Sequence, residues 1–256
     1  MNLSVREYFN LIKEFSLADF KIRDQRTVLG FLWSFINPMI MSAILFFLFK
    51  SRLMGDYKIN YFFYILIGNV TWNFFSLSTT LAAVTLILKE SIVKNFSFPK
   101  EILVLSAIGT FLIQHFFELL AVFIFAIIFK IGFSIHILWL PLILFTEIML
   151  IAGLSLFLSC LCVYVKDIDH IWMVITRMGF FVVPIFYELS DISPKFKWLI
   201  AINPMTQIII FLRDVLLYHR NPVFFNLMLL FLFNLIFLCL GSIFFNKNKY
   251  KIAERV

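Results

Sequence analysis

Six long runs of apolar residues constrain the fold of this 256-residue chain more than any other feature. The runs cover residues 29–49, 61–88, 102–129, 135–165, 170–187 and 221–245. Each is close to the roughly 20 residues that a helix needs to cross the hydrocarbon core of a bilayer. Hydrophobic residues make up 62% of the chain and charged residues only 14%, which excludes an ordinary soluble domain. We therefore expect an all-α polytopic membrane protein with six transmembrane helices.

The connections between these runs leave no room for a second domain, so residues 1–256 are expected to form a single transmembrane domain. Its expected parts are an interfacial helix and linker (1–28), spans one to five (29–187), a re-entrant region (188–220), span six (221–245) and a tail (246–256). With six spans, both termini lie on the same side. The connections on that side hold thirteen Lys and Arg residues against eight on the other, so the positive-inside rule predicts cytoplasmic termini.

The stretch "VREYFNLIKEF", which begins at Val5, predicts an amphipathic helix before the first span. One helical face carries its apolar residues Val5, Tyr8, Phe9, Ile12 and Phe15. We expect this helix to lie flat on the cytoplasmic membrane surface, since the chain has no soluble core to receive it. No apolar segment followed by a cleavage site precedes it, so we predict no secretory signal.

The connection "KESIVKNFSFPKE", residues 89–101, holds a short apolar ridge among charged residues. The ridge consists of Ile92, Val93 and Phe96. A short amphipathic element of this kind is able to dock into the groove of a partner protein. The alternative is an ordinary solvated loop.

Residues 188–214 contain two apolar pieces, 198–202 and 205–212, that are too short to cross a bilayer. Ser193 and Asn203 each precede a proline, a pattern that predicts two brief helices with N-caps at these positions. Irregular backbone at membrane depth survives only where protein or a water-filled cavity covers it. We therefore expect two short re-entrant helices between spans five and six that close a pathway at its outer end. The candidate outer-gate residues are Tyr187, Trp198, Asn203 and Pro204.

The second span is unusually hydrophilic, with seven Asn, Ser and Thr residues between Asn69 and Thr80. These side chains either line an aqueous route or form hydrogen bonds with neighbouring helices. In the first span, Pro38 removes one helical hydrogen bond and leaves the carbonyl of Ser34 free, which predicts a kink and a polar spot. The candidate translocation-path residues are Ser34, Asn37, Asn69, Trp72, Asn73, Thr79 and Thr176.

Four ionisable residues, His115, Glu118, Glu147 and Arg177, lie inside predicted spans. Each is costly if it faces lipid, so we expect all four to face protein. A buried ion pair between Arg177 and one of the glutamates is the simplest arrangement, and a proton relay is the alternative.

Several kinds of site are not expected. The net charge of +7 comes from short flanks between apolar runs and not from one basic face, which argues against nucleic acid. The three cysteines lie in apolar stretches without a CxxC pattern, so we expect neither disulfides nor a metal site. No GxxxxGK[ST] loop and no clustered acid–base set occur, so we expect no cofactor and no enzymatic activity in this chain.

Three stretches resemble the ABC-2 type permeases that export bacterial polysaccharides. They are "IRDQRTVLGFLWSFINPM", "NFSFPKE" and "VYVKDIDHIWMVITRMGFFVVPIFYELSDISPKFKWLIAINPM". The resemblance covers nearly the whole chain and is strongest to the O-antigen permease subunit, with capsule and teichoic acid exporters also similar. It implies export of lipid-linked polysaccharide, undecaprenyl-linked, across the bacterial inner membrane. It also implies a homodimer that binds two copies of a separate ABC ATPase, in which ATP and Mg²⁺ are held.

The resemblance also implies roles for particular residues. The turn from the interfacial helix into span one corresponds to Arg26, Leu29, Gly30 and Trp33. The ATPase-coupling residues correspond to Glu90, Ile92, Val93, Lys94 and Phe96. Three other functions stay open: an ABC-2 permease for a drug or small lipid, an intramembrane enzyme acting on lipid phosphates, and an ion or proton carrier that uses Glu118 and Glu147.

Overall fold

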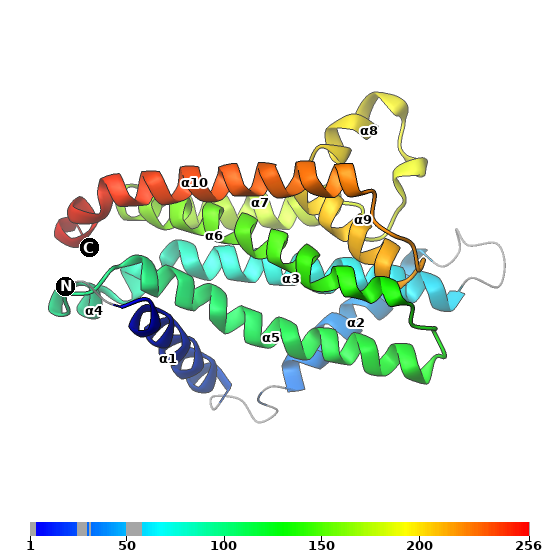
Figure 1. Ribbon diagram of the computed structural model, residues 1–256, viewed down its shortest axis with the longest axis horizontal. Coiled ribbons are helices and arrows are strands. Elements are labelled where there is room, and N and C mark those ends of the chain that lie inside the picture. The colour runs from blue at the N-terminus through cyan, green and yellow to red at the C-terminus, as the bar shows by residue number, and fades with distance from the viewer. Residues whose placement is uncertain (1–3, 25–29, 31, 50–57, 256) are drawn as a thin grey trace.

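The computed structural model describes residues 4–24, 30, 32–49 and 58–255, and the regular structure in these ranges is entirely helical (Figure 1). The longer helices are α1 (Val5–Asp24), α2 (Leu32–Phe49), α3 (Lys58–Leu88), α5 (Glu101–Ile128), α6 (Leu140–Tyr164), α7 (Ile168–Val182), α9 (Pro204–Leu216) and α10 (Phe224–Arg255). The short ones are α4 (Glu90–Asn95), α8 (Pro194–Ala201) and the 3₁₀ helices η2 (Ile135–Trp139) and η3 (Leu189–Asp191). The expected all-α class is confirmed.

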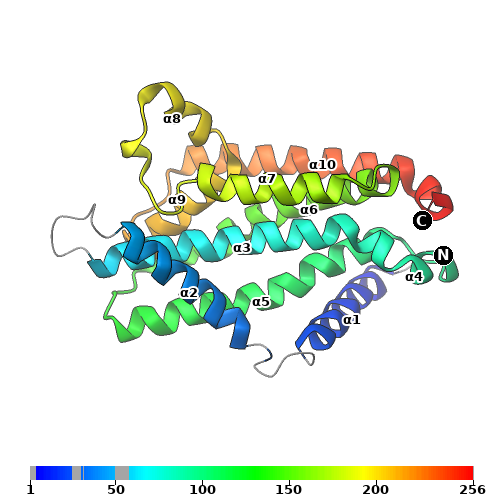
Figure 2. The ribbon, with the colours of Figure 1, turned by 180° about the vertical axis from the view of Figure 1, so that it is seen from behind.

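Helix α3 forms the centre of the bundle, with α5 and α6 packed along it and α2, α7 and α9 against other faces (Figures 1 and 2). Every residue from Phe63 to Val70 on α3 is buried. Burial on all sides explains why this part of the sequence is apolar without helical periodicity. Helices α1 and α4 and the last turns of α10 lie at one end of the bundle, and α8 lies at the other (Figure 1). We call these the coupling end and the outer end.

Five helical segments of the described residues are long and apolar enough to cross a membrane, or six if the bent pair α8 and α9 counts as one. The predicted fifth span, 170–187, is the shorter α7, whose 15 residues reach only about 22 Å. Pro184 explains the early end, because proline disfavours helical backbone in the preceding residue, and Val183 is indeed extended with ψ 140°. The expectation of one continuous helix over 170–187 is therefore wrong.

Helix α10 continues into the segment 246–256, which the sequence assigned to a separate tail. It runs to Arg255, since no proline or glycine follows Gly241. The extension packs against the end of α6: Ile252 is fully buried, and Asn248 accepts a hydrogen bond from the Tyr164 hydroxyl at 3.0 Å. The tail is thus a helical extension of the last span.

Helices α8 and α9 are the two brief helices expected in the region 188–220, and they meet at 88°. The side chain of Asn203 caps α9 by accepting a hydrogen bond from the Met205 amide at 2.9 Å, as predicted. Ser193 is the N-cap residue of α8, also as predicted, but its side chain makes no capping hydrogen bond. Helix α9 is buried against α3 and α6, whereas no residue of α8 is buried.

Helices α6 and α10 cross with backbone in direct contact. A Cβ atom on Gly241 would lie 2.1 Å from the carbonyl oxygen of Gly153, and one on Gly153 would lie 2.6 Å from the carbonyl oxygen of Phe237. Small residues allow this approach of helices, whose packing in lipid depends on van der Waals contact. No local pattern predicts this contact, because the two glycines belong to different helices and form no GxxxG motif.

Candidate coupling surface and transport path

Helix α4 is a single short helix that begins where the long central helix α3 ends (Figure 2). Only Lys89 separates the two, and its carbonyl accepts hydrogen bonds from the amides of Ile92 and Val93 at 2.9 and 3.0 Å. The Nζ atom of Lys94 lies 2.5 Å from Oε1 of Glu90, one turn earlier. This hydrogen bond lowers the pKa of the Glu90 carboxyl from its usual value. A rotation of α4 would therefore act directly on the end of α3.

The apolar ridge of α4 is divided between two faces. Val93 is 2% exposed and belongs to the main core, and Ile92 is partly buried against the same core. Phe96, in contrast, is 61% exposed, and so is Leu88 at 69%. Val93 therefore anchors the helix and offers no surface to a partner, because its side chain is already covered. The accessible surface, here called the coupling surface, consists of Leu88, Glu90, Lys94 and Phe96. Leu88 was not among the residues predicted for coupling, because in the sequence it is the last residue of the second apolar run.

The residues on either side of α4 are tied to α1 by an ion pair and by stacked rings. The Nζ atom of Lys89 lies 2.5 Å from Oδ2 of Asp19 on α1, and the two side chains are only 18% and 24% exposed. The ring of Phe15 on α1 stacks on Phe98 with centroids 5.9 Å apart.

The carboxyl end of α4 is closed by Lys100. Its Nζ atom donates to the carbonyls of Val93 and Phe96 at 2.5 and 2.6 Å. Cations stabilise the negative end of a helix in this way. Burial lowers the pKa of Lys100 from its usual value. Helix α4 is thus held at both ends before any partner binds.

Helix α1 is in turn fixed to α5 at a close crossing. The Ser16 hydroxyl donates to the carbonyl of Ser106 at 3.1 Å, and the Thr110 hydroxyl donates to the carbonyl of Ser16 at 3.3 Å. A Cβ atom on Gly109 would lie 2.3 Å from the Ser16 hydroxyl oxygen, so glycine makes the approach possible. The coupling surface, α1 and α5 therefore form one connected unit.

Two of the polar residues of α3, Asn69 and Thr79, hold helices together. The Asn69 amide donates to the carbonyl of Pro38 at 3.1 Å and to the Ser42 hydroxyl at 3.2 Å, both on α2. The indole of Trp172 on α7 donates to the Thr79 hydroxyl at 3.0 Å. For Asn69 and Thr79, these contacts show the helix-to-helix hydrogen bonding that was one of the two roles considered for the polar second span.

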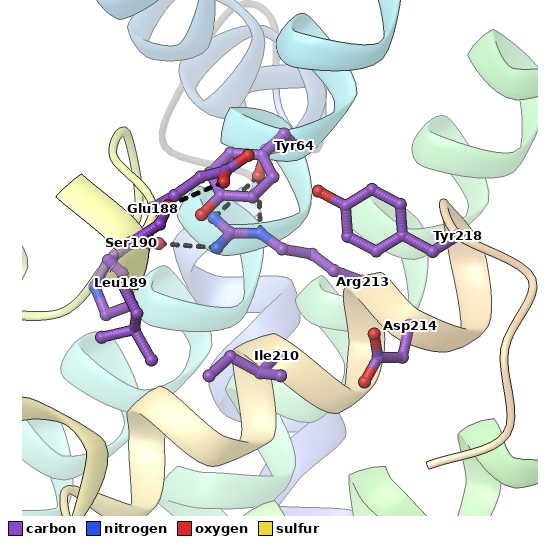
Figure 3. A pocket seen from close by; sticks show the side chains of 9 residues that line it. Tyr64, Glu188, Leu189, Ser190, Ile210, Arg213, Asp214 and Tyr218 are labelled. Carbon is purple, nitrogen blue, oxygen red and sulfur yellow. Dashed lines mark hydrogen bonds between the residues drawn. The ribbon is translucent and has the colours of Figure 1, made fainter. Parts of the chain in front are cut away.

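At the outer end, Arg213 of α9 joins three segments that are distant in sequence (Figure 3). It is 2% exposed, and its guanidinium donates to the carbonyls of Tyr64, Pro184 and Ile185 at 2.7–3.1 Å. A Cβ atom on Gly68 would lie 2.7 Å from the guanidinium, so this glycine makes room for it. Arg213 thereby satisfies the carbonyls that the break after α7 leaves unpaired. From the sequence, Arg213 was expected only as one of the eight basic residues in the connections on the outer side.

Residues 15–217 match the family described as ABC-2 type transporter. This match begins within α1 and ends after α9, so it includes α4, the central helices and the bent pair. The chain belongs to the ABC-2 type transporter family. As an ABC-2 permease, it is a multi-pass membrane subunit of a transporter and not itself an enzyme.

Curated proteins similar to the permease cover its whole length. It is 26% identical over 255 residues to an O-antigen export system permease protein RfbA of Klebsiella pneumoniae, and the aligned region covers 99% of this chain and 98% of that protein. It is 24% identical over 252 residues to the protein of the same name from Myxococcus xanthus, with 98% and 96% covered. The resemblance to ABC-2 permeases of the O-antigen group is confirmed.

The other candidate path residues of the permease differ in accessibility. Asn37 is exposed and Asn73 is partly exposed. Ser34, Trp72 and Thr176 are 8%, 5% and 6% exposed within the single chain. The structure therefore leaves Asn37 and Asn73 as the predicted polar path residues with accessible side chains.

The ionisable residues inside the helices do not pair as expected. Arg177 is exposed and donates to the sulfur of Met173 at 3.1 Å, so the predicted ion pair with a glutamate is wrong. Glu118 accepts a hydrogen bond from Gln114 at 2.7 Å, and its Oε2 lies 3.7 Å from Nδ1 of His115. Glu147 is fully buried and has no hydrogen-bond partner among the described residues.

The predicted outer-gate and interface residues lie as follows. Trp198 is 64% exposed on α8, and Asn203 and Pro204 stand at the bend between α8 and α9. Tyr187 follows α7 and donates from its hydroxyl to the carbonyl of Val182. In the turn before α2, Gly30 has φ 49°, a left-handed conformation that favours glycine, and Trp33 is 48% exposed. Arg26 and Leu29 lie outside the described residues.

Proposed function

We propose that this chain is the permease subunit of an ABC transporter that exports lipid-linked polysaccharide, of the O-antigen type, from the cytoplasmic side of the bacterial inner membrane. The observation that carries the proposal is the end-to-end similarity to O-antigen export permeases, in which 98–99% of this chain is matched. An undecaprenyl lipid would carry the glycan. The coupling end, with both chain termini, would lie in the cytoplasm.

Two copies of the permease would bind two copies of an ABC ATPase, which holds ATP and Mg²⁺. The exposed Phe96 and Leu88 would enter the ATPase cleft, with Glu90 and Lys94 beside them. ATP binding would then rotate α4 and, through its contacts with α1 and α3, move the helices of the bundle.

The glycan would pass between the two copies, along surfaces of α2, α3 and α7. Asn37 and Asn73 are accessible in the single chain and are suited to meet sugar hydroxyls. A protein-lined route is required, since transfer of many hydroxyl groups through hydrocarbon costs several kcal/mol each. The lipid tail would stay in the bilayer, and α8 and α9 would close the outer end.

The proposal is tested by deleting the gene and restoring it with variants. Deletion should remove the long surface glycan and leave lipid-linked glycan inside the cell, and the wild-type gene should restore export. Phe96→Asp should abolish both export and copurification of the ATPase, because it places a charge on the docking surface. Phe133→Asp is the matched control, since Phe133 is 49% exposed in the connection after α5 and should tolerate the change.

A full glycan coat in the deletion strain would refute the proposal. The rival function, export of a drug or small lipid, would show itself if the purified complex hydrolysed ATP faster with such a compound and not with lipid-linked glycan.

A further inference from the structure

The outer end of the permease contains an open cavity of about 280 Å³ beside α9 (Figure 3). It is lined by Tyr64, Pro184, Glu188, Leu189, Ser190, Ile210, Arg213, Asp214 and Tyr218. The volume is close to the lower limit of about 300 Å³ for small-molecule sites, so it suits one small unit and not an extended chain.

The guanidinium of Arg213 forms the back of the cavity and is largely occupied. Three backbone carbonyls accept its hydrogen bonds, and its Cζ atom lies 3.3 Å from the centroid of the Tyr64 ring. The ring of Tyr61 stacks near Tyr64 at 6.1 Å, and the Tyr64 hydroxyl donates to the carbonyl of Tyr187. These residues shape the cavity and fix one positive charge there, but they leave little to bind a ligand.

Asp214 and Tyr218 are the groups with free capacity. They lie four residues apart at the end of α9, on the side where Arg213 and Tyr64 lie (Figure 3). Within the described ranges, neither the Asp214 carboxylate nor the Tyr218 hydroxyl has a hydrogen-bond partner, and Tyr218 is 42% exposed. Glu188 already accepts hydrogen bonds from the Ser190 hydroxyl and from the Asp191 backbone amide, and its carboxylate oxygens keep lone pairs for a further donor.

The charges of the cavity select the chemistry of its occupant. Two carboxylates, Glu188 and Asp214, are balanced by the guanidinium of Arg213 and by that of Arg220, which lies 5.6 Å from the centroid of the Tyr218 ring, so no net charge attracts an anion such as phosphate. The guanidinium at the back in turn disfavours a divalent cation. A neutral molecule rich in hydroxyl groups remains, because its O–H groups donate to carboxylates, which only accept.

We propose that this cavity is a subsite for one neutral sugar unit of the exported glycan. Asp214 and Glu188 accept hydrogen bonds from adjacent hydroxyls of the sugar, and the Tyr218 hydroxyl completes the set. The assignment rests on the proposed function, since it takes the glycan to pass the outer end. Its role is to hold the leading part of the chain as it leaves the permease.

The test measures binding to the complete permease–ATPase complex in a detergent without a sugar headgroup. The probe is a set of short oligosaccharides cut from the delipidated surface glycan of the source cells, followed by saturation-transfer NMR. Wild-type complex should transfer saturation to sugar protons, and neither inorganic phosphate nor Ca²⁺ should compete. Asp214→Asn and Tyr218→Phe should each weaken binding about 5- to 20-fold, the effect of losing one hydrogen bond to a ligand hydroxyl. Glu14→Gln, an exposed carboxylate on α1, is the matched control and should bind as wild type.

Two results would overturn the subsite. One is wild-type affinity in both variants while they remain folded and bound to the ATPase, and the other is absence of any saturation transfer to the wild-type complex. Competition by phosphate or Ca²⁺ would overturn the assignment to a neutral sugar. Each result leaves the proposed function standing, because that function is judged separately by surface glycan in the deletion strain.

Discussion

The ion pair between Lys89 and Asp19 offers the sharpest test of how α4 moves the bundle. It joins the turn before α4 to α1, and within the described residues it is the one ion pair between these two parts. We expect the pair to transmit motion of α4 to α1, so that its loss uncouples ATP hydrolysis from export without removing the coupling surface. The perturbation is the charge reversal Asp19→Lys or Lys89→Asp, and then both together.

The size of the effect follows from the geometry of the pair. The charged atoms are 2.5 Å apart, and the side chains are 18% and 24% exposed, which places the pair between a surface and a buried one. Exposed pairs contribute about 0.2–1 kcal/mol and breaking a buried pair costs about 3–5 kcal/mol, so we take about 1.5 kcal/mol here. Each 1.4 kcal/mol is a factor of ten, so the tethered arrangement should become about tenfold less populated.

The assay is the amount of glycan exported per ATP hydrolysed by the complex in liposomes. Each single reversal should lower this ratio at least about threefold, with ATPase copurification unchanged, because Phe96 and its neighbours are untouched. The double reversal restores opposite charges and should recover more than half of the loss. Glu14→Lys on the exposed face of α1 is the control for adding positive charge to this helix.

Two outcomes would refute this explanation. Single reversals with a wild-type ratio would mean that α4 and α1 need no tether. A double reversal as defective as the two single losses combined would mean that the residues act separately, through other contacts such as the Lys89 ammonium over the Phe15 ring at 5.5 Å.

Three further predictions concern the fold. Gly241→Val should lower the free energy of unfolding of the purified permease by about 1–3 kcal/mol, because the valine side chain would overlap the backbone of Gly153. The melting temperature should therefore fall, and a value equal to wild type would contradict the close crossing. Arg213→Met should leave the carbonyls of Pro184 and Ile185 unpaired and increase hydrogen exchange in the segment after α7, measured by mass spectrometry. Unchanged exchange would show that the guanidinium does not hold this segment. Lys94 lowers the pKa of Glu90, so their pair stabilises α4 at neutral pH, and this contribution is lost as the pH falls below 4.5 through the lowered pKa. A spin label on α4 should become more mobile at that acidic pH. In Glu90→Gln this acid-dependent change should be absent.

Much of the candidate site could be predicted because local sequence determines it. The connection after the second span had to form a short exposed element, since charged residues flank a few apolar ones between two long helices. The bend at Asn203–Pro204 was likewise predictable from the local sequence, because the asparagine side chain caps the helix that the proline begins. These features depend on residues a few positions apart.

Other features of the candidate site could not be predicted from residues a few positions apart. Val93 and Phe96 are both apolar and three residues apart, yet one is buried and the other is exposed. Their difference depends on where α3 and α5 place the surface of the core. Similarly, Asn69 was as suited to a water-filled route as to a contact with α2, and only the position of the Pro38 carbonyl decided between them.

The sequence by itself determined that the chain is a helical membrane protein, where most of its long helices lie, and that the segment between α7 and α10 is broken. The physical reason is that a bilayer offers no water to unpaired backbone groups, so apolar runs of sufficient length must become helices. Only the tertiary structure decided which helices touch, as at Gly153 and Gly241, and which charge closes the break after α7, as Arg213 does. Those contacts join residues far apart in the chain, and their energies depend on the meeting of surfaces that no local pattern specifies.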